Sequence, residues 1–166
     1  MKKIVFVSDT DGCYIDDENI FDSEQDDTFR YEDDGIYTCN VNNVIKRNKQ
    51  KTKNLNVINS TNTIFYKKFE AYYFSCNLDH VLHGERNLLG NDKRMYAIEY
   101  ADSFFEKEFD FISFISEKSL APIKTYRKSW EFIKLDNNSI LRYTNFNTFF
   151  LNNYDYLREE MKKFVK

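Results

Sequence analysis

The feature that most constrains this 166-residue sequence is a short apolar run, residues 3–8, that leads directly into Asp9-Thr10-Asp11-Gly12. The run is rich in β-branched and aromatic residues, which is typical of a buried strand near the centre of a sheet. Two carboxylates one residue apart, where the chain leaves that strand, can both reach one hard cation, and Gly12 permits a close approach. Asp9 and Asp11, the acidic pair, therefore predict a site for Mg²⁺ or Mn²⁺. The alternative is that they only terminate the strand, as Asp and Gly do in many turns.

The residues after this strand predict an α/β arrangement. Residues 28–31 and 35–39 flank an acidic turn and predict a hairpin insertion, in which Gly35 supplies an unusual backbone angle. Apolar residues recur at helical intervals over residues 42–59, with Lys and Arg between them. Residues 71–76 (AYYFSC) predict a second core strand, and residues 77–83 a strand that leads into a helical turn. We expect a small, partly parallel sheet.

The C-terminal half predicts helices. The length fits one domain, residues 1–166, in which residues 1–90 form the α/β part that carries the acidic motif and residues 91–166 form a helical part packed on it. Pro122, the only proline, is expected between two of the helices. The expected buried faces are Met95, Ile98, Ala101 and Phe105; Tyr126, Trp130 and Ile133; and Tyr154, Leu157, Met161, Phe164 and Val165.

A second cluster of polar residues follows the second core strand and contains both histidines of the chain. If the two core strands are parallel neighbours, Asp79 or His80 would emerge near the acidic pair, Asp79 as a further metal ligand and His80 as an aid to proton transfer. The alternative is that Asn77 and Asp79 cap a helix and that His80 is an ordinary packed or surface residue. A zinc site on His80 and His83 is disfavoured because no third ligand has a convincing spacing.

The net charge of -3 conceals a strong asymmetry along the chain. The segment from Asp9 to Asp34 contains twelve carboxylates and one base, Arg30. A basic run within the expected helix follows it and could neutralise the phosphates of DNA or RNA, or form a solvated helix face. Tyr66, Lys67 and Lys68 would add to a nucleic-acid surface if they lie on the same side. The basic run consists of Lys46, Arg47, Lys49, Lys51 and Lys53.

Cysteine usage and hydropathy exclude several classes. Cys13, Cys39 and Cys76 are odd in number, have no CxxC spacing and follow no signal-like start, so we expect a reduced, cytoplasmic setting. No base or partner is identifiable for a nucleophilic cysteine. No apolar run approaches the roughly 18 to 20 residues needed to cross a bilayer, so no membrane-spanning role is expected.

Residues 5–12 (VFVSDTDG) and 74–83 (FSCNLDHVLH) together resemble the Toprim-like nuclease proteins of bacterial defence and mobile elements, including the RloB-type group. The resemblance covers residues 3–105. It implies a Toprim- or Rossmann-like sheet in which Asp9 and Asp11 bind Mg²⁺ and Asp79 stands as a further acid.

The chain departs from that family in two respects. The family's usual glutamate, on an earlier strand, would precede the start of this chain, and the Pro and Glu of the family's second motif are absent. The resemblance therefore implies a relative shortened at its N-terminus, a piece of a larger protein or a form that has lost cleavage, with a sheet edge available to a protein partner or a second copy.

The first motif also resembles that of haloacid-dehalogenase-like phosphatases, which implies Asp9 as the nucleophile and Asp11 as the general acid. Cys13 departs from that family's usual Thr. No later strand ends in an acidic pair, since Asp110 is isolated between two phenylalanines, and Lys124 would have to serve as the family's lysine.

These observations leave three functional hypotheses. The first is a Mg²⁺-dependent, Toprim-like nuclease of phage defence or a mobile element, with catalytic residues Asp9, Asp11, Asp79 and His80 and with nucleic acid as its partner. The second is a non-catalytic interaction protein that retains the fold and uses its acidic segment to imitate nucleic-acid charge. The third is the phosphatase. The sequence does not identify a substrate.

Overall fold

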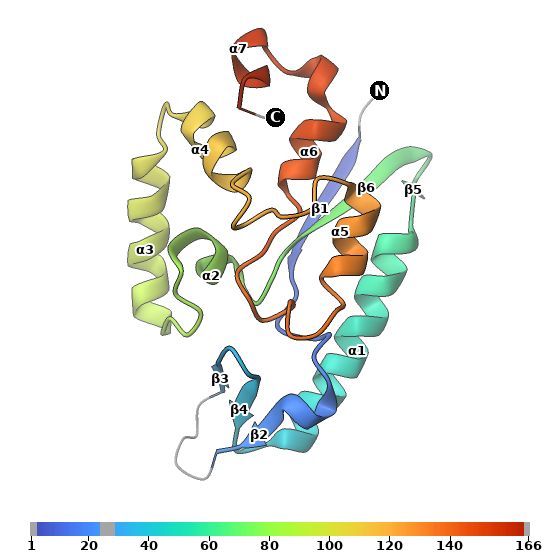
Figure 1. Ribbon diagram of the computed structural model, residues 1–166, viewed down its shortest axis with the longest axis vertical. Helices are drawn as coiled ribbons and strands as arrows, with labels where there is room; N and C mark the ends of the chain where they lie inside the picture. Colours follow the sequence, from blue (N-terminus) through green and yellow to red (C-terminus); the bar gives the residue numbers. More distant parts are fainter. Residues whose placement is uncertain (1–2, 24–28, 165–166) are drawn as a thin grey trace.

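The structure is a computed structural model that describes residues 3–23 and 29–164. The described strands all lie in the first half of the chain, where α1 separates the first four from the last two, and helices follow in the second half (Figure 1). The strands are β1 (Ile4–Asp9), β2 (Ile20–Asp22), β3 (Arg30–Tyr31), β4 (Ile36–Thr38), β5 (Thr63–Ile64) and β6 (Lys67–Phe74). The α-helices are α1 (Val41–Ser60), α2 (Leu78–His83), α3 (Gly90–Ser103), α4 (Glu108–Ile115), α5 (Tyr126–Phe132), α6 (Asn147–Asn152) and α7 (Glu159–Lys162); two short 3-10 helices are η1 (Asp17–Asn19) and η2 (Tyr154–Tyr156).

The main sheet has the strand order β1-β6-β5, so β1 is an edge strand. The prediction of a buried strand near the centre of the sheet is therefore wrong: β6 is the one neighbour of β1 among the described residues, and Val5, Phe6 and Val7 are 40%, 39% and 39% exposed. Strands β1 and β6 are parallel, from the pair Ile4 and Phe69 to the pair Asp9 and Phe74, whereas β5 and β6 form a tight antiparallel hairpin. The two parallel strands therefore end at the same edge, where the chain carries the acidic pair. This confirms the predicted small α/β fold with a partly parallel sheet. The second core strand starts earlier than predicted, and the segment after it is helical from Leu78.

The insertion between β1 and α1 is a second small sheet with the order β2-β4-β3. The predicted hairpin is confirmed as the antiparallel pair β3 and β4, and β2 adds to it in parallel. The predicted reason for Gly35 is wrong, because the two described glycines with positive φ are Gly12 and Gly84. Gly35 is needed for space, since a side chain there would overlap the backbone oxygen of Asn19.

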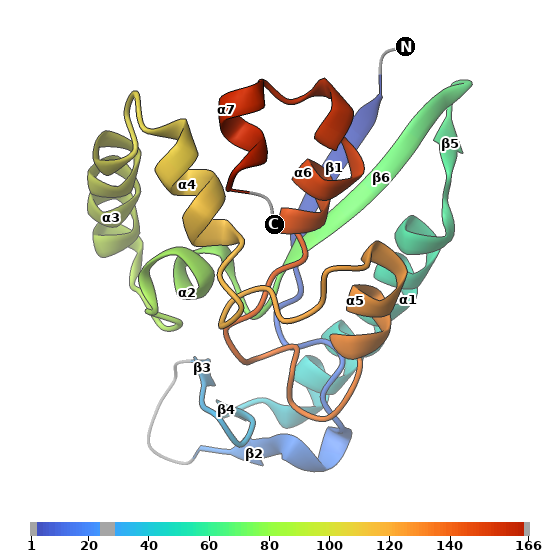
Figure 2. The ribbon, with the colours of Figure 1, turned by 45° about the horizontal axis from the view of Figure 1, so that its top comes forward.

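Helices pack on both faces of the main sheet (Figure 2). On one face, Tyr73 of β6 packs with Leu55 of α1 and with Trp130 of α5, and the indole N–H of Trp130 donates to the carbonyl of Ala71. On the other face, Phe74 packs with residues of α2, α4 and α6. Trp130 and Ile133 are buried as predicted, and Pro122 lies between α4 and α5 as predicted.

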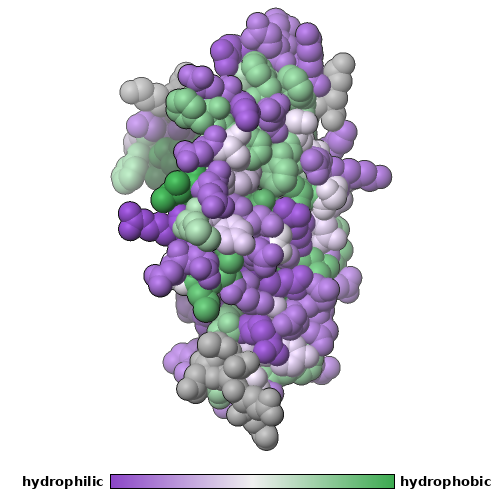
Figure 3. Space-filling view, turned by 90° about the vertical axis from the view of Figure 1, so that its left-hand side faces the viewer, coloured by the Kyte–Doolittle hydropathy of each residue, from purple (hydrophilic) through white to green (hydrophobic). Residues whose placement is uncertain are grey.

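Helix α3 does not bury the face that was predicted for it. Met95, Ile98 and Phe105 are each at least half exposed, and α3 has no buried residue. The helix instead turns Tyr96 and Tyr100 toward the ring of His83. Figure 3 views the molecule from this side and shows apolar surface interspersed among polar residues.

The last predicted face is partly confirmed. Leu157 and Met161 pack against the cluster of α4 and α6, whereas Tyr154 and Phe164 are more than a third exposed. Val165 lies outside the described residues. In the part of the chain that the structure describes, no helix has the length and apolarity to cross a bilayer.

Candidate acidic site at the end of β1

The acidic pair lies in a turn that three hydrogen bonds hold in place. Asp9 is the last residue of β1, and Asp11 follows in the left-handed region with φ 49°. The N–H of Thr10 donates to the carbonyl of Phe74 at 2.9 Å, and the N–H of Asp11 donates to that of Cys76 at 2.8 Å. The buried hydroxyl of Thr10 donates to the carbonyl of Ser139 at 2.7 Å. These bonds fix the backbone of both acids to the end of β6 and to the loop after α5.

Two residues of the basic run reach the acidic pair from α1. Arg47 and Lys51 are four residues apart and therefore lie on one face of the helix. The ammonium of Lys51 forms an ion pair with the carboxylate of Asp11, and the guanidinium of Arg47 donates to the backbone carbonyl of Asp11 at 2.8 Å. The sequence predicted the acidic pair and the basic run as separate features, and the structure joins them.

The carboxyl of Asp9 differs electrostatically from that of Asp11. Burial raises the pKa of Asp9 to about 6, and the charge of Asp11 adds to the rise, whereas Lys51 and a hydrogen bond from the N–H of Leu78 oppose it. Asp9 thus exchanges a proton close to neutral pH while Asp11 is neutralised by Lys51. A cation bound at this pair would compete with that proton.

Asp79 lies in the first turn of α2, directly after β6. The side chain of Asn77 caps this helix by accepting the N–H of His80 at 2.8 Å, as the capping alternative predicted. The charge of Asp79 contributes to the raised pKa of Asp9, and its carboxylate is 3.7 Å from the ammonium of Lys93. Across residues 3–23 and 29–164, no three His, Cys, Asp or Glu side chains are grouped so that they could hold a metal ion. The structure therefore brings the acidic pair together without completing the predicted three-ligand set.

His80 is a packed residue. Its side chain is 3% exposed, and its Nδ1 has no hydrogen-bond partner among the described residues. Burial lowers the pKa of His80 to about 4, and the positive charges of Arg86 and Arg142 lower it further. A neutral imidazole surrounded by arginines fits the packed alternative rather than a role in proton transfer.

The low pKa of His80 predicts a pH dependence of stability. The unfolded chain binds a proton at this residue below about pH 6.5, and the folded chain binds it only below about pH 4. The free energy of unfolding should therefore fall by about 2 to 3 kcal/mol from this residue between pH 6.5 and pH 4. Asp9 acts in the opposite sense in the same range, so the informative comparison is between variants. The free energy of unfolding of His80→Leu, measured with urea, should fall by about 2 to 3 kcal/mol less than that of the wild type between pH 6.5 and pH 4. The same dependence of this free energy on pH in both proteins would contradict the prediction.

Sequence reasoning missed the loop residues that support the site. Arg142 donates to the carbonyls of His80 and Val81 at 2.9 and 3.0 Å, and so caps the C-terminal end of α2. Ser139 accepts the hydroxyl of Thr10. Both residues are about 60 or more positions away along the chain from their partners. No local pattern identifies such contacts.

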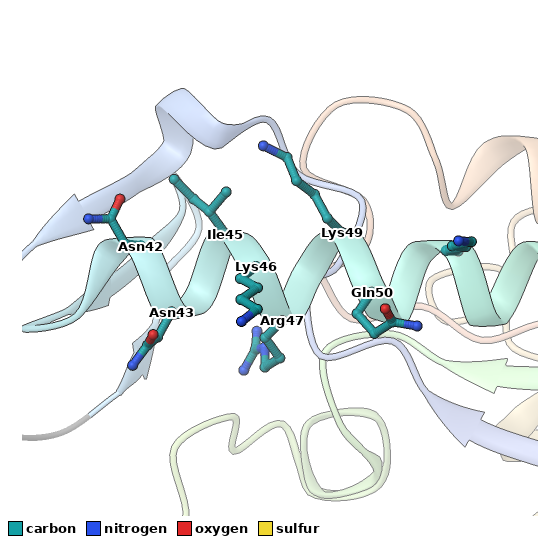
Figure 4. A pocket seen from close by; sticks show the side chains of 8 residues that line it. Asn42, Asn43, Ile45, Lys46, Arg47, Lys49 and Gln50 are labelled. Carbon is teal, nitrogen blue, oxygen red and sulfur yellow. The ribbon is translucent and has the colours of Figure 1, made fainter.

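The rest of the basic run lines the surface of α1 beside the site. A shallow groove of about 720 Å³ follows the helix (Figure 4). Lys46 and Lys53 are exposed there, and Lys49 forms a 2.6 Å ion pair with Asp17. A second groove, between β1 and α1, contains Lys51 and shares Arg47 with the first. Cationic side chains therefore continue from this surface to the acidic pair. The first groove is lined by Asn42, Asn43, Ile45, Lys46, Arg47, Lys49, Gln50 and Lys53.

Comparisons of the chain with models of protein families, with curated proteins and with solved structures found no match. The candidate site is therefore described from its own residues and geometry.

Proposed function

We propose that this protein is a Mg²⁺-dependent domain that cleaves phosphodiester bonds in nucleic acid, with Asp9 and Asp11 as the ligands of the cation. The observation that carries the proposal is the convergence of Arg47 and Lys51 on Asp11. It places the positive charge that a phosphate needs next to the carboxylates that a cation needs.

The donor set fits Mg²⁺, which commonly takes one or two carboxylates and completes its shell with water and substrate phosphate. Bound there, the cation would polarise the phosphate and activate a water molecule. Lys51 neutralises Asp11 in the free protein. With a cation held by the acidic pair, Lys51 would be available to the phosphate, while Arg47 holds the turn by its bond to the backbone of Asp11. Asp79, in the first turn of α2, would add negative charge beside the cation.

Calorimetric titration with Mg²⁺ tests the site itself. We expect binding to the wild type and loss of that binding in Asp11→Asn, because one of two ligands becomes neutral. Asp22→Asn, which changes an exposed carboxylate of the same acidic segment, is the matched control and should bind like the wild type. Absence of binding to the wild type would refute the proposal and leave the acidic pair with a structural role.

A phosphomonoesterase is the second candidate, because the acidic pair follows the end of a parallel strand and a lysine lies beside it. The charges of the two carboxyls would have to change on substrate binding, since burial raises the pKa of Asp9, the proposed nucleophile, and Lys51 pairs with the carboxylate of Asp11, the proposed general acid. The lysine at the acidic pair is Lys51 rather than Lys124, and Asp110 lies within α4 instead of at a strand end. Hydrolysis of p-nitrophenyl phosphate without cleavage of oligonucleotides would select this candidate over the first.

We further propose that the free edge of β1 pairs with a strand of a second copy. β1 lies at the end of the strand order, and Val5, Phe6 and Val7 are 40%, 39% and 39% exposed. The N–H of Thr10 bonds toward β6, so by alternation the N–H groups of Val5 and Val7 point away from it. Exposed apolar edge strands with unpaired backbone groups readily pair with other strands.

Light scattering coupled to size-exclusion chromatography tests this edge. The wild type should form dimers whose fraction rises with concentration, and Val7→Lys should be monomeric, because a lysine on an edge strand opposes pairing. Val57→Lys makes the same change at an exposed residue of α1 and should leave the dimer intact. A wild type that stays monomeric throughout would contradict the prediction.

A further inference from the structure

The hairpin between β5 and β6 has an unusual tip. Ile64 pairs with Lys67, so Phe65 and Tyr66 alone form the loop. Both residues have positive φ, 48° and 62°. Two-residue loops of this kind strongly favour Asn-Gly, because a bulky side chain in the left-handed region is strained. The sequence therefore places two large aromatic residues where the backbone disfavours them.

The folded chain gains no visible packing from these two rings. Phe65 is 86% exposed and Tyr66 is 101% exposed. Within residues 3–23 and 29–164, neither ring makes a ring–ring or cation–π contact. Strained backbone conformations cluster at active sites, ligand-binding sites and switch regions, where the strain is part of the function.

The surroundings of the tip are positively charged. Lys67 and Lys68 follow directly and are exposed. The nearby carboxylate, Glu70, is neutralised by Lys3 at 2.9 Å and by Lys68 at 2.8 Å. A groove at the base of the hairpin contains Tyr66 and Lys68, and a neighbouring groove, which shares Asn62 and Tyr126 with it, contains Arg127. The tip thus combines free aromatic faces with cations, and the carboxylate at its base, Glu70, is paired.

We propose that the tip, Phe65 to Lys68, binds single-stranded nucleic acid by stacking unpaired bases on Phe65 and Tyr66, with phosphates beside Lys67 and Arg127. Aromatic faces with adjacent cations are the general means by which proteins hold unpaired strands without reading their sequence. The tip lies at the start of β6, and the acidic pair follows the end of the parallel strand β1, so the two lie at opposite ends of the main sheet (Figures 1 and 2). Binding at the tip therefore needs neither Mg²⁺ nor the proposed cleavage.

Fluorescence anisotropy with a labelled 15-mer of thymidine in EDTA tests the proposal. The double variant Phe65→Asn, Tyr66→Gly should bind at least tenfold more weakly than the wild type. The same variant should have a higher thermal midpoint, because Asn-Gly adopts the loop conformation without strain. A purely structural role of the two rings predicts the opposite change in stability. Phe105→Asn, which removes an exposed ring elsewhere, should bind like the wild type.

Three results would overturn the proposal. The first is a wild type that does not bind the oligonucleotide. The second is a double variant that binds it with unchanged affinity. The third is co-sedimentation of the wild type with phosphatidylcholine–phosphatidylglycerol vesicles that the double variant loses while oligonucleotide binding persists, which would identify the tip as a membrane contact. The Mg²⁺ titration of the acidic pair is judged separately, because the anisotropy experiment contains no metal.

Discussion

Replacing Gly12 with alanine is expected to lower the free energy of unfolding by about 3 kcal/mol or more. Gly12 has φ +66°, which strains any residue with a side chain. Its added Cβ would overlap the side chain of Ile140 and lie 3.1 Å from that of Ile36. Both isoleucines are fully buried, so neither can move aside without disturbing the core under the acidic turn.

Urea unfolding of Gly12→Ala and Gly90→Ala measures this effect against a matched control. Gly90 begins α3 and has open space where a Cβ would lie, so alanine there should be neutral or slightly stabilising. The acidic pair should also lose its arrangement in Gly12→Ala, since Asp11 is the preceding residue. Equal stability of the two variants would show that the turn rearranges freely and does not hold the acidic pair rigidly.

Asp9→Asn is expected to reduce metal-dependent cleavage of an oligonucleotide by more than about 100-fold. Loss of residues that only support metal ligands already costs about 10- to 100-fold, and Asp9 is proposed as a ligand itself. The amide has nearly the shape of the carboxyl, so the core should stay intact. Its stability near neutral pH should equal or exceed that of the wild type, because burial and Asp11 disfavour the charge of Asp9.

The pairing of lost activity with retained stability separates a functional carboxylate from a structural one. Initial rates with a fluorescent oligonucleotide and saturating Mg²⁺ should be compared with thermal midpoints of the same samples. Asp22→Asn should match the wild type in both measurements. Full cleavage by Asp9→Asn would refute the catalytic assignment, whereas a large loss of stability would assign Asp9 to the fold.

Patterns that depend on nearby residues were predicted well. The helical periodicity of α1, the hairpin of β3 and β4 and the burial of Trp130 were all confirmed. The apolar run forms the strand β1 as predicted, but at the edge of the sheet instead of its centre. Each arises from the spacing of apolar residues or from turn residues within one segment. The acidic pair was found for the same reason, since its two carboxyls are neighbours in the sequence.

Contacts between distant segments were decided only by the tertiary structure. Periodicity gave α3 an apolar face, but which face meets a neighbour depends on how the helix is placed, and the predicted one is exposed. His80 follows β6 as predicted, yet it is buried near Arg86 and Arg142. The bonds of Arg142 to α2 have no trace in the local sequence.

The sequence by itself determined the strand, the turn and the two carboxyls, because local sterics and hydrophobic spacing specify them. The packing of α1 against the end of β1 decided that Lys51 neutralises Asp11 and that Arg47 holds its backbone. Burial in the folded chain decided that Asp9 keeps a proton to about pH 6. Charges act through space, so their partners and the shifts of their pKa values arise only once the chain has folded.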